Sequence, residues 1–153
     1  MSTYTQILYQ VVFSTKYREK TLTKPGREEL FQYIWGILSD RRCHLHRINA
    51  VEDHIHIVFS LHQSVALAQL VQDIKVASSK YIKQKGLFPK FTSWQIGYGA
   101  FTYSVESRKN LIRYVKNQEA HHARKNFEKE YTQMLRQQKV QFDEKYLFEG
   151  ENN

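Results

Sequence analysis

The chain has 153 residues, of which 41% are hydrophobic and 25% charged, the balance of an ordinary globular domain with a hydrophobic core. Its formal net charge of +8 favours a polyanionic partner. Nucleic acid ranks ahead of a membrane, since no apolar run approaches the roughly 20 residues of a membrane helix. The first residues lack the pattern of a signal peptide, so we expect a cytoplasmic protein. The single cysteine, Cys43, excludes an internal disulfide and a cysteine-based zinc site.

The N-terminal third predicts one strand and one helix. Residues 6–14 (QILYQVVFS) are rich in β-branched and aromatic residues and are apolar on both faces, which predicts a central strand. Residues 15–20 form a basic loop, which fits a contact with a phosphate backbone as well as a solvated turn. Apolar residues then recur every three or four positions over residues 27–41, which predicts an amphipathic helix.

Two further strands are predicted over residues 44–51 and 54–61, joined by a short turn into a hairpin. The first of them contains His44 and His46 but lacks a clean alternation of polar and apolar residues. We therefore interpret that first pair as exposed strand histidines.

The second strand of the hairpin carries the clearest motif in the chain. Ile55 and Ile57 share one face of this strand, while His54 and His56 stand together on the other face. Two positions along a strand separate the Cα atoms by about 6.6 Å, so both imidazoles can converge on one cation. The competing interpretation is an ordinary half-buried strand with two outward polar residues.

The second half of the chain predicts a helix, a strand and two more helices. Residues 66–85 form an amphipathic pattern that Gly86 ends. Residues 94–104 (WQIGYGAFTYS) predict a strand whose two glycines indicate a bulge or the close approach of another backbone or ligand. Helices are predicted over residues 107–124 and 126–139.

This order of elements predicts an α+β fold of the ferredoxin-like, RRM-like βαββαβ type, with helices on one face of an antiparallel sheet and an added helix. The first and third strands are central in that topology, and the first two helices are expected to leave the histidine face open. The added helix is free to lie across that face or to reach another subunit. An open sheet face on a basic protein suits a nucleic-acid strand. We expect residues 1–125 to form the main domain and residues 126–153 a helical extension of it.

The predicted helix over residues 107–124 has a polar stripe that could join the histidines. Its members recur every three or four positions: Asn110, Tyr114, Gln118 and His121 or His122. Gln118 offers an amide oxygen, and the turn before the histidine strand offers the carboxylates of Glu52 or Asp53. A mixed nitrogen and oxygen shell suits a cation that polarises a phosphoryl oxygen.

Tyr114 lies one helical turn before Gln118, so both side chains point the same way. A phenol in that position could attack phosphorus and form a phosphotyrosine, which keeps the bond energy for a later rejoining step. The competing interpretation of Tyr114 is an amphipathic tyrosine at the edge of the core.

The motif DHIHI at residues 53–57, followed some sixty residues later by LIRYVKNQ at residues 111–118, resembles a known family. It is similar to the IS200-like single-tyrosine transposases of small bacterial insertion sequences, which belong to the His-hydrophobic-His endonuclease superfamily. The REP-associated tyrosine transposases are close kin. The resemblance runs from the first strand to Gln118, and residues 126–147 lie outside the motif.

The resemblance implies that His54, His56 and Gln118 bind Mg²⁺ or Mn²⁺, and that Tyr114 is the nucleophile. It implies cleavage of single-stranded DNA hairpins at element ends, with a 5′-phosphotyrosine and a free 3′-hydroxyl. It also implies a homodimer in which the tyrosine helix of one subunit commonly completes the site of the other.

Three other functions stay open at this point. A catalytically silent or domesticated relative would bind hairpins without forming a covalent product. A metal-dependent phosphodiesterase would use water in place of Tyr114. An RNA-binding sheet of the same topology fits less well, because the third strand presents histidines where such modules present aromatic residues.

Overall fold

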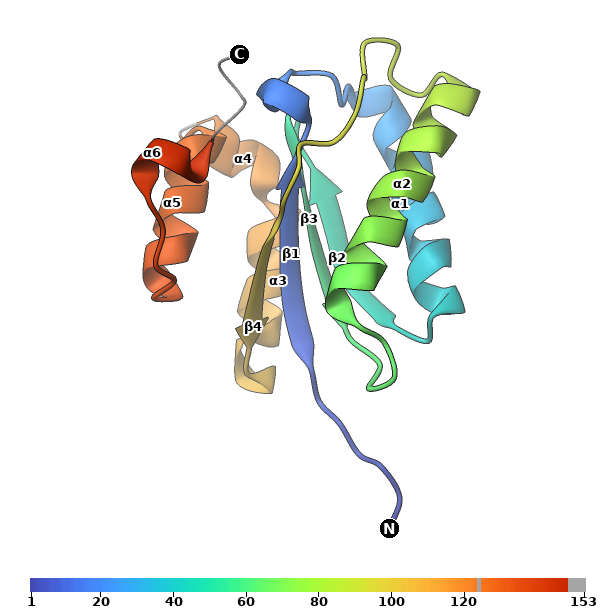
Figure 1. Cartoon of the computed structure of the whole chain (residues 1–153), viewed down its shortest axis with the longest axis vertical. Coiled ribbons are helices and arrows are strands. Elements are labelled where there is room, and N and C mark those ends of the chain that lie inside the picture. Colours follow the sequence, from blue (N-terminus) through green and yellow to red (C-terminus); the bar gives the residue numbers. More distant parts are fainter. Residues whose placement is uncertain (124, 149–153) are drawn as a thin grey trace.

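Four antiparallel strands form one sheet in the order β2-β3-β1-β4 in the computed structural model (Figure 1), which describes residues 1–123 and 125–148. The strands are β1 (Leu8–Ser14), β2 (His44–Ala50), β3 (His54–Ser60) and β4 (Gly99–Tyr103). The helices are α1 (Lys24–Asp40), α2 (Leu67–Lys85), α3 (Arg108–Lys116), α4 (Gln118–His122), α5 (Phe127–Gln137) and α6 (Glu144–Leu147), with 3₁₀ turns η1 (Lys16–Arg18) and η2 (Val105–Ser107).

The central position of β1 and β3 confirms the predicted βαββαβ topology. β3 pairs with β2 on one side and with β1 on the other, and Val12 of β1 lies opposite His56. Gln10 pairs with Val58 and is therefore the diagonal neighbour of His56 on the same face. The strand register therefore places Gln10 and His56 side by side on the same face of the sheet.

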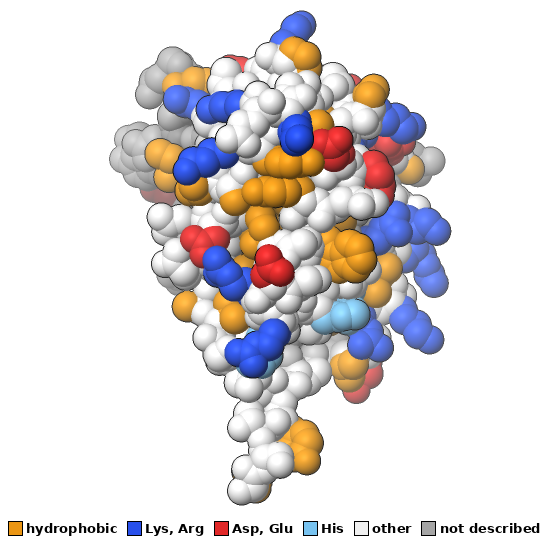
Figure 2. All heavy atoms as spheres, turned by 90° about the vertical axis from the view of Figure 1, so that its right-hand side faces the viewer, with side chains coloured by type: hydrophobic (Ala, Val, Ile, Leu, Met, Phe, Trp, Pro, Cys, Tyr) orange, Lys and Arg blue, Asp and Glu red, His pale blue; other side chains and the backbone are white. Residues whose placement is uncertain are grey.

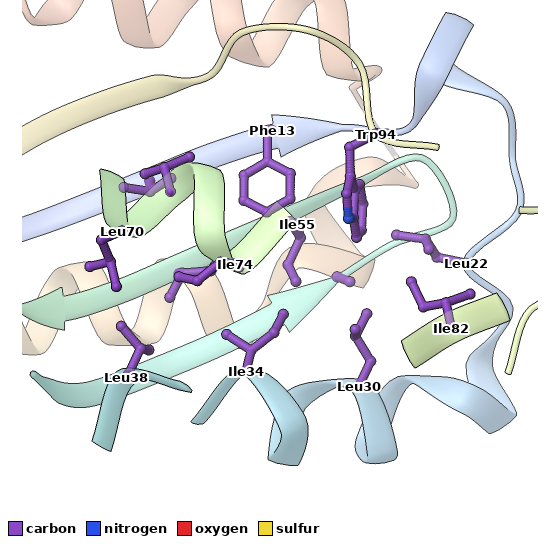
Figure 3. Packing of buried hydrophobic residues seen from close by; sticks show 14 of the residues in the cluster. Phe13, Leu22, Leu30, Ile34, Leu38, Ile55, Leu70, Ile74, Ile82 and Trp94 are labelled. Carbon is purple, nitrogen blue, oxygen red and sulfur yellow. The ribbon is translucent and has the colours of Figure 1, made fainter. Parts of the chain in front are cut away.

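The main core lies between the sheet and the helices α1 and α2 (Figure 3). Ile55 and Ile57 of β3 are fully buried there, as their parity predicts. Leu30 and Ile34 present one stripe of α1, and Ile74 belongs to the facing stripe of α2. Figure 2 views the outer face of these two helices, where Lys and Arg side chains are spread around the surface with acidic side chains among them.

The histidine face of the sheet is covered, so the added helix takes the first of its two expected places, across that face. The helices α3, α4 and α5 lie on the opposite side of the sheet from α1 and α2 (Figure 1). Val58 has the same parity as the histidines and packs with Leu111 and Val115 of α3. The apolar stripe of α3 needs an apolar partner, and Val58 provides it. Consequently His54 and His56 are completely buried.

The predicted helix over residues 107–124 is interrupted. α3 ends at Lys116, Asn117 leaves the helical region at φ −95° and ψ 23°, and α4 begins at Gln118. The expected end at Arg124 lies outside the described residues. The helix predicted over 126–139 is confirmed as α5, and the side chain of its N-cap residue Asn126 accepts a hydrogen bond from the Lys129 amide at 3.0 Å.

The strand predicted over residues 94–104 is shorter than expected. Only Gly99–Tyr103 is regular strand, and Trp94 forms an isolated bridge with Thr15. Another segment does approach the backbone closely at Gly99, as a glycine within a strand indicates. A Cβ at this position would lie 2.7 Å from the Tyr131 hydroxyl of α5. The missing side chain lets α5 pack directly on β4.

Among the described residues, no helix combines the length and the apolar composition needed to cross a bilayer.

Gly99→Ala should weaken the packing of α5 on the sheet. The added methyl group must displace Tyr131, and overpacking of this kind costs about 1–3 kcal/mol of the free energy of unfolding. Urea denaturation measures it. Gly36→Ala is the matched control, since a Cβ at this exposed helical glycine meets nothing within 4 Å and should stabilise α1 by up to about 1 kcal/mol. Equal stability of the Gly99→Ala variant and the wild type would contradict the role assigned to Gly99.

Candidate active site

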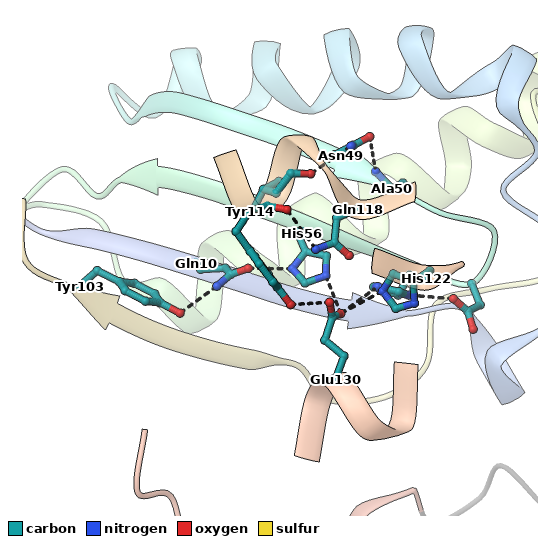
Figure 4. Close-up of polar contacts among 12 residues, drawn as sticks. Gln10, Asn49, Ala50, His56, Tyr103, Tyr114, Gln118, His122 and Glu130 are labelled. Carbon is teal, nitrogen blue, oxygen red and sulfur yellow. Dashed lines mark hydrogen bonds and ion pairs between the residues drawn. The ribbon is translucent and has the colours of Figure 1, made fainter. Parts of the chain in front are cut away.

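The carboxylate of Glu130 in α5 is the meeting point of four other side chains (Figure 4). Its Oε1 atom lies 3.3 Å from Nε2 of His54, 3.0 Å from Nε2 of His56 and 3.1 Å from Nε2 of His122. Its Oε2 atom accepts a hydrogen bond from the hydroxyl of Tyr114. Elements β3, α3, α4 and α5 of a single chain therefore build one buried cluster.

The two strand histidines are oriented by hydrogen bonds at their other ring nitrogen. Nδ1 of His54 lies 2.7 Å from Oδ1 of Asp53, and Nδ1 of His56 lies 2.7 Å from Oε1 of Gln10. Gln10 is held in turn, because its Nε2 donates to the Tyr103 hydroxyl at 2.9 Å. Carboxylate and amide oxygens only accept, so both Nδ1 atoms carry hydrogen and each neutral ring has its lone pair on Nε2.

Those Nε2 lone pairs face the carboxylate oxygen of Glu130, so three acceptors come together in a buried space. Such an arrangement requires a positive charge among them, either a proton or a metal ion. Within the described part of the chain, Nε2 of His54 and Oε1 of Gln118 are buried and have no hydrogen-bond partner. The ligand atoms of His54, His56, His122 and Glu130 all lie within 4.8 Å of one another. Three imidazoles and a carboxylate fit a divalent transition-metal ion.

The electrostatics of the cluster agree with this description. Burial acts to raise the pKa of Glu130, but the imidazoles around it outweigh burial and hold that pKa well below the usual range. Burial lowers the pKa of His56 to about 4, which keeps this ring neutral. For His54, burial acts to lower the pKa, but Asp53 and Glu130 outweigh it and raise the pKa. Of the two strand imidazoles, His54 is therefore the one whose surroundings favour a proton.

Tyr114 is held as a protonated phenol. Burial and the negative charge of Glu130 both raise the pKa of Tyr114. Its ring centroid lies 6.0 Å from that of His56 and 4.8 Å from that of His121. The phenol therefore sits beside the histidine pair, and Glu130 is the group in direct contact with its hydroxyl.

The structure brings the residues predicted from the sequence together in one place. His54, His56 and Tyr114 meet as expected. Gln118 is buried and points toward the cluster (Figure 4), and its Nε2 donates to the Tyr114 carbonyl at 3.5 Å. Asp53, considered as a ligand, contacts Nδ1 of His54 and orients that ring instead. The metal role of Gln118 stays a prediction.

Sequence reasoning missed Glu130 and left His122 as one of two alternatives in a polar stripe. A signal for Glu130 existed in the spacing of α5. The residue lies three positions after Phe127 and four before Met134, both of which are buried on the same face. A carboxylate within an apolar helical stripe needs a buried partner, which is a reason to look for one.

Comparison with known proteins decides the family. The family model described as "Transposase IS200 like" matches residues 3–118 of the chain. This chain belongs to the IS200-like transposase family. The matched region includes His54, His56, Tyr114 and Gln118 and ends before His122. The other two candidate metal ligands of this IS200-like transposase, His122 and Glu130, lie beyond the matched region.

Two solved structures share the fold of this IS200-like transposase. A protein from Deinococcus radiodurans R1, described as a candidate transposase, matches with a TM-score of 0.62 and 20% identity over 77% of this chain and 95% of its own. A REP-associated tyrosine transposase bound to a REP hairpin matches with a TM-score of 0.57 and 17% identity over 80% of this chain and 74% of its own. No curated protein shows significant similarity.

Mn²⁺ should stabilise the folded protein through this cluster. At a hundredfold excess over Kd, a ligand that binds only the folded state adds about 2.7 kcal/mol to the free energy of unfolding. Thermal unfolding with Mn²⁺, Mg²⁺ and EDTA measures the effect. Mn²⁺ should act more strongly than Mg²⁺, because imidazole nitrogen suits transition metals. The effect should weaken as the pH falls from 7 to 5, because binding must displace the proton of His54.

The metal-dependent stabilisation should disappear in His56→Ala and Glu130→Ala and persist in His44→Ala, since His44 lies exposed on β2. The same Mn²⁺ effect in the Glu130→Ala variant as in the wild type would contradict the assignment of Glu130 as a ligand.

Proposed function

We propose that this IS200-like transposase cleaves and rejoins single-stranded DNA at hairpin-marked element ends, through a 5′-phosphotyrosine on Tyr114 and a divalent metal ion. The observation that carries the proposal is the shared carboxylate. Glu130 touches the Tyr114 hydroxyl with one oxygen and the imidazoles of His54 and His56 with the other. A nucleophile and a metal-binding pair are thereby held at one point.

His54, His56, His122 and Glu130 would hold the metal ion, which the family resemblance suggests is Mg²⁺ or Mn²⁺, and the Gln118 oxygen is an additional acceptor nearby. When bound, such an ion supplies a Lewis acid that polarises a phosphoryl oxygen and offsets the negative charge beside the phenol. Asp53 and Gln10 keep the two strand imidazoles in the tautomer that binds metal.

The covalent step exchanges one phosphodiester bond for another. The Tyr114 oxygen forms a bond to phosphorus as the bond from phosphorus to the 3′-oxygen breaks, leaving one strand on the protein and a 3′-hydroxyl on the other. Glu130 accepts the phenol proton, since it already accepts the hydrogen bond from that hydroxyl. The departing 3′-oxygen takes up one proton, which balances the proton that Tyr114 releases to Glu130, and the reverse reaction rejoins the strands without an energy source.

A cavity of about 500 Å³ beside the cluster supports a nucleic-acid substrate. Lys20, Lys24 and Arg27 line it together with Asp53 and His122. Lys24 and Arg27 pair with Glu119 in the same lining, and a phosphate on one side of the scissile bond could share these cations. The solved REP-associated transposase is bound to a hairpin, which supports the choice of hairpin substrates here.

The test is covalent capture on a denaturing protein gel. Labelled single strands from the DNA that flanks the gene are incubated with the protein and Mg²⁺ or Mn²⁺. Wild type should carry the label at protein size, whereas Tyr114→Phe should lose the adduct because it lacks the attacking oxygen. His56→Ala should reduce the adduct at least a hundredfold, as expected for loss of a ligand of a catalytic metal. Tyr4→Phe is the matched control, since Tyr4 is 87% exposed.

Free cleaved DNA that persists in Tyr114→Phe would show that water is the nucleophile. Hairpin binding without cleavage in the presence of either Mg²⁺ or Mn²⁺ would contradict the proposal that the protein cleaves these strands. It would favour a catalytically silent DNA-binding protein.

A further inference from the structure

A second cavity, of about 510 Å³, opens next to Tyr114 and Glu130. Four carboxamide side chains line it, together with these two residues: Gln10, Asn110, Gln133 and Gln137. We call it the amide pocket. Its volume falls within the range of about 300–1,000 Å³ that is usual for small-molecule sites. Anything bound there lies against the proposed nucleophile.

We propose that the amide pocket binds one unpaired nucleobase next to the scissile phosphate and makes cleavage selective for that base. This inference rests on the proposed function and deepens it, because it assigns to the protein a direct reading of the single strand at the cut.

The lining of the amide pocket matches a nucleobase better than a phosphate. The cavity beside His122 presents three cations, Lys20, Lys24 and Arg27, among three carboxylates, so charged groups dominate it. The amide pocket has one cation, Lys125, beside Glu130, and the rest of its lining combines uncharged carboxamides with apolar side chains such as Leu111 and Met134. A base has apolar faces and an edge of donors and acceptors, so it can satisfy both kinds of surface.

Three of the carboxamides are available for a ligand. Gln10 is committed to His56 and Tyr103, but Asn110, Gln133 and Gln137 have no hydrogen-bond partner within residues 1–123 and 125–148. A carboxamide presents a donor and an acceptor side by side, the pattern that pairs with a base edge, and a good bidentate pair discriminates by about 1–3 kcal/mol.

The helices α3 and α5, which line the amide pocket, also carry Tyr114 and Glu130 of the candidate active site. Asn110 lies one turn before Tyr114 on α3, and Gln133 lies one turn after Glu130 on α5. A base held between these helices is therefore fixed relative to the phenol and the carboxylate. Lys125 adds a cation to the lining, where it can contact the phosphate of the bound nucleotide.

The experiment uses the full chain with Mn²⁺ and a pool of single strands that carry a stem-loop with randomised flanks. Strands that become covalently attached are isolated with the protein and sequenced, and so are the released fragments, so both bases at the cut are read. Wild type should select one base at a position next to the cut. The variant Asn110→Ala/Gln133→Ala/Gln137→Ala should still form adducts and lose about tenfold or more of that selectivity.

Gln63→Ala/Gln84→Ala is the matched control, because both glutamines are exposed and lie away from the amide pocket. It should keep the wild-type selectivity. Adducts of wild type without a base preference next to the cut, or the same preference in the triple variant, would overturn the base-reading proposal and leave the proposed function standing.

If no strand is captured by any of these proteins, the proposed function fails, and a binding measurement decides the pocket separately. The four deoxynucleoside monophosphates are titrated into the protein while the side-chain amide signals of Asn110, Gln133 and Gln137 are followed by NMR. Shifts confined to these amides and stronger for one base support the pocket. Unchanged amide signals overturn it.

Discussion

The structure around the sheet's second face depends on one buried carboxylate. A buried charge is tolerated only with partners, and Glu130 has three imidazoles on one oxygen and a phenol on the other. These contacts require α3, α4 and α5 to fold onto the same face at once. Gly99 permits the approach of α5, and Asn117 breaks the helix so that Tyr114 and His122 can both reach the carboxylate.

Local patterns predicted the sheet and the helices but not what covers the histidine face. The alternation along β3 and the periodicity of α1 and α2 indicate which face of each element is buried. The order of these elements predicted the topology, and their buried faces predicted the main core. Val58 shows why the sequence left the place of the third helix open: Val58 shares the parity of the histidines, and its packing with Leu111 and Val115 is a contact between distant segments. The interruption at Asn117 leaves the spacing of apolar residues intact, so periodicity does not detect it.

The same distinction holds for the candidate site. His54 and His56 could be predicted because one strand brings them together, and Tyr114 because a family motif carries it. Glu130 lies 74 positions beyond His56, past the end of the family match, and only the fold joins the two. Residues 126–148 thus supply a member of the site, and the division into domains at residue 125 stays a prediction.

One chain brings Tyr114, His54 and His56 together at Glu130 in this structure, whereas the family resemblance implies that a second subunit completes the site. Tyr114→Phe and His56→Ala, coexpressed and purified together, test it by covalent capture of single-stranded DNA. We predict no adduct above the level of either variant alone, because neither chain has both residues. An adduct restored toward the wild-type level would contradict the account, since it requires the intact tyrosine of one subunit to act at the intact histidines of another.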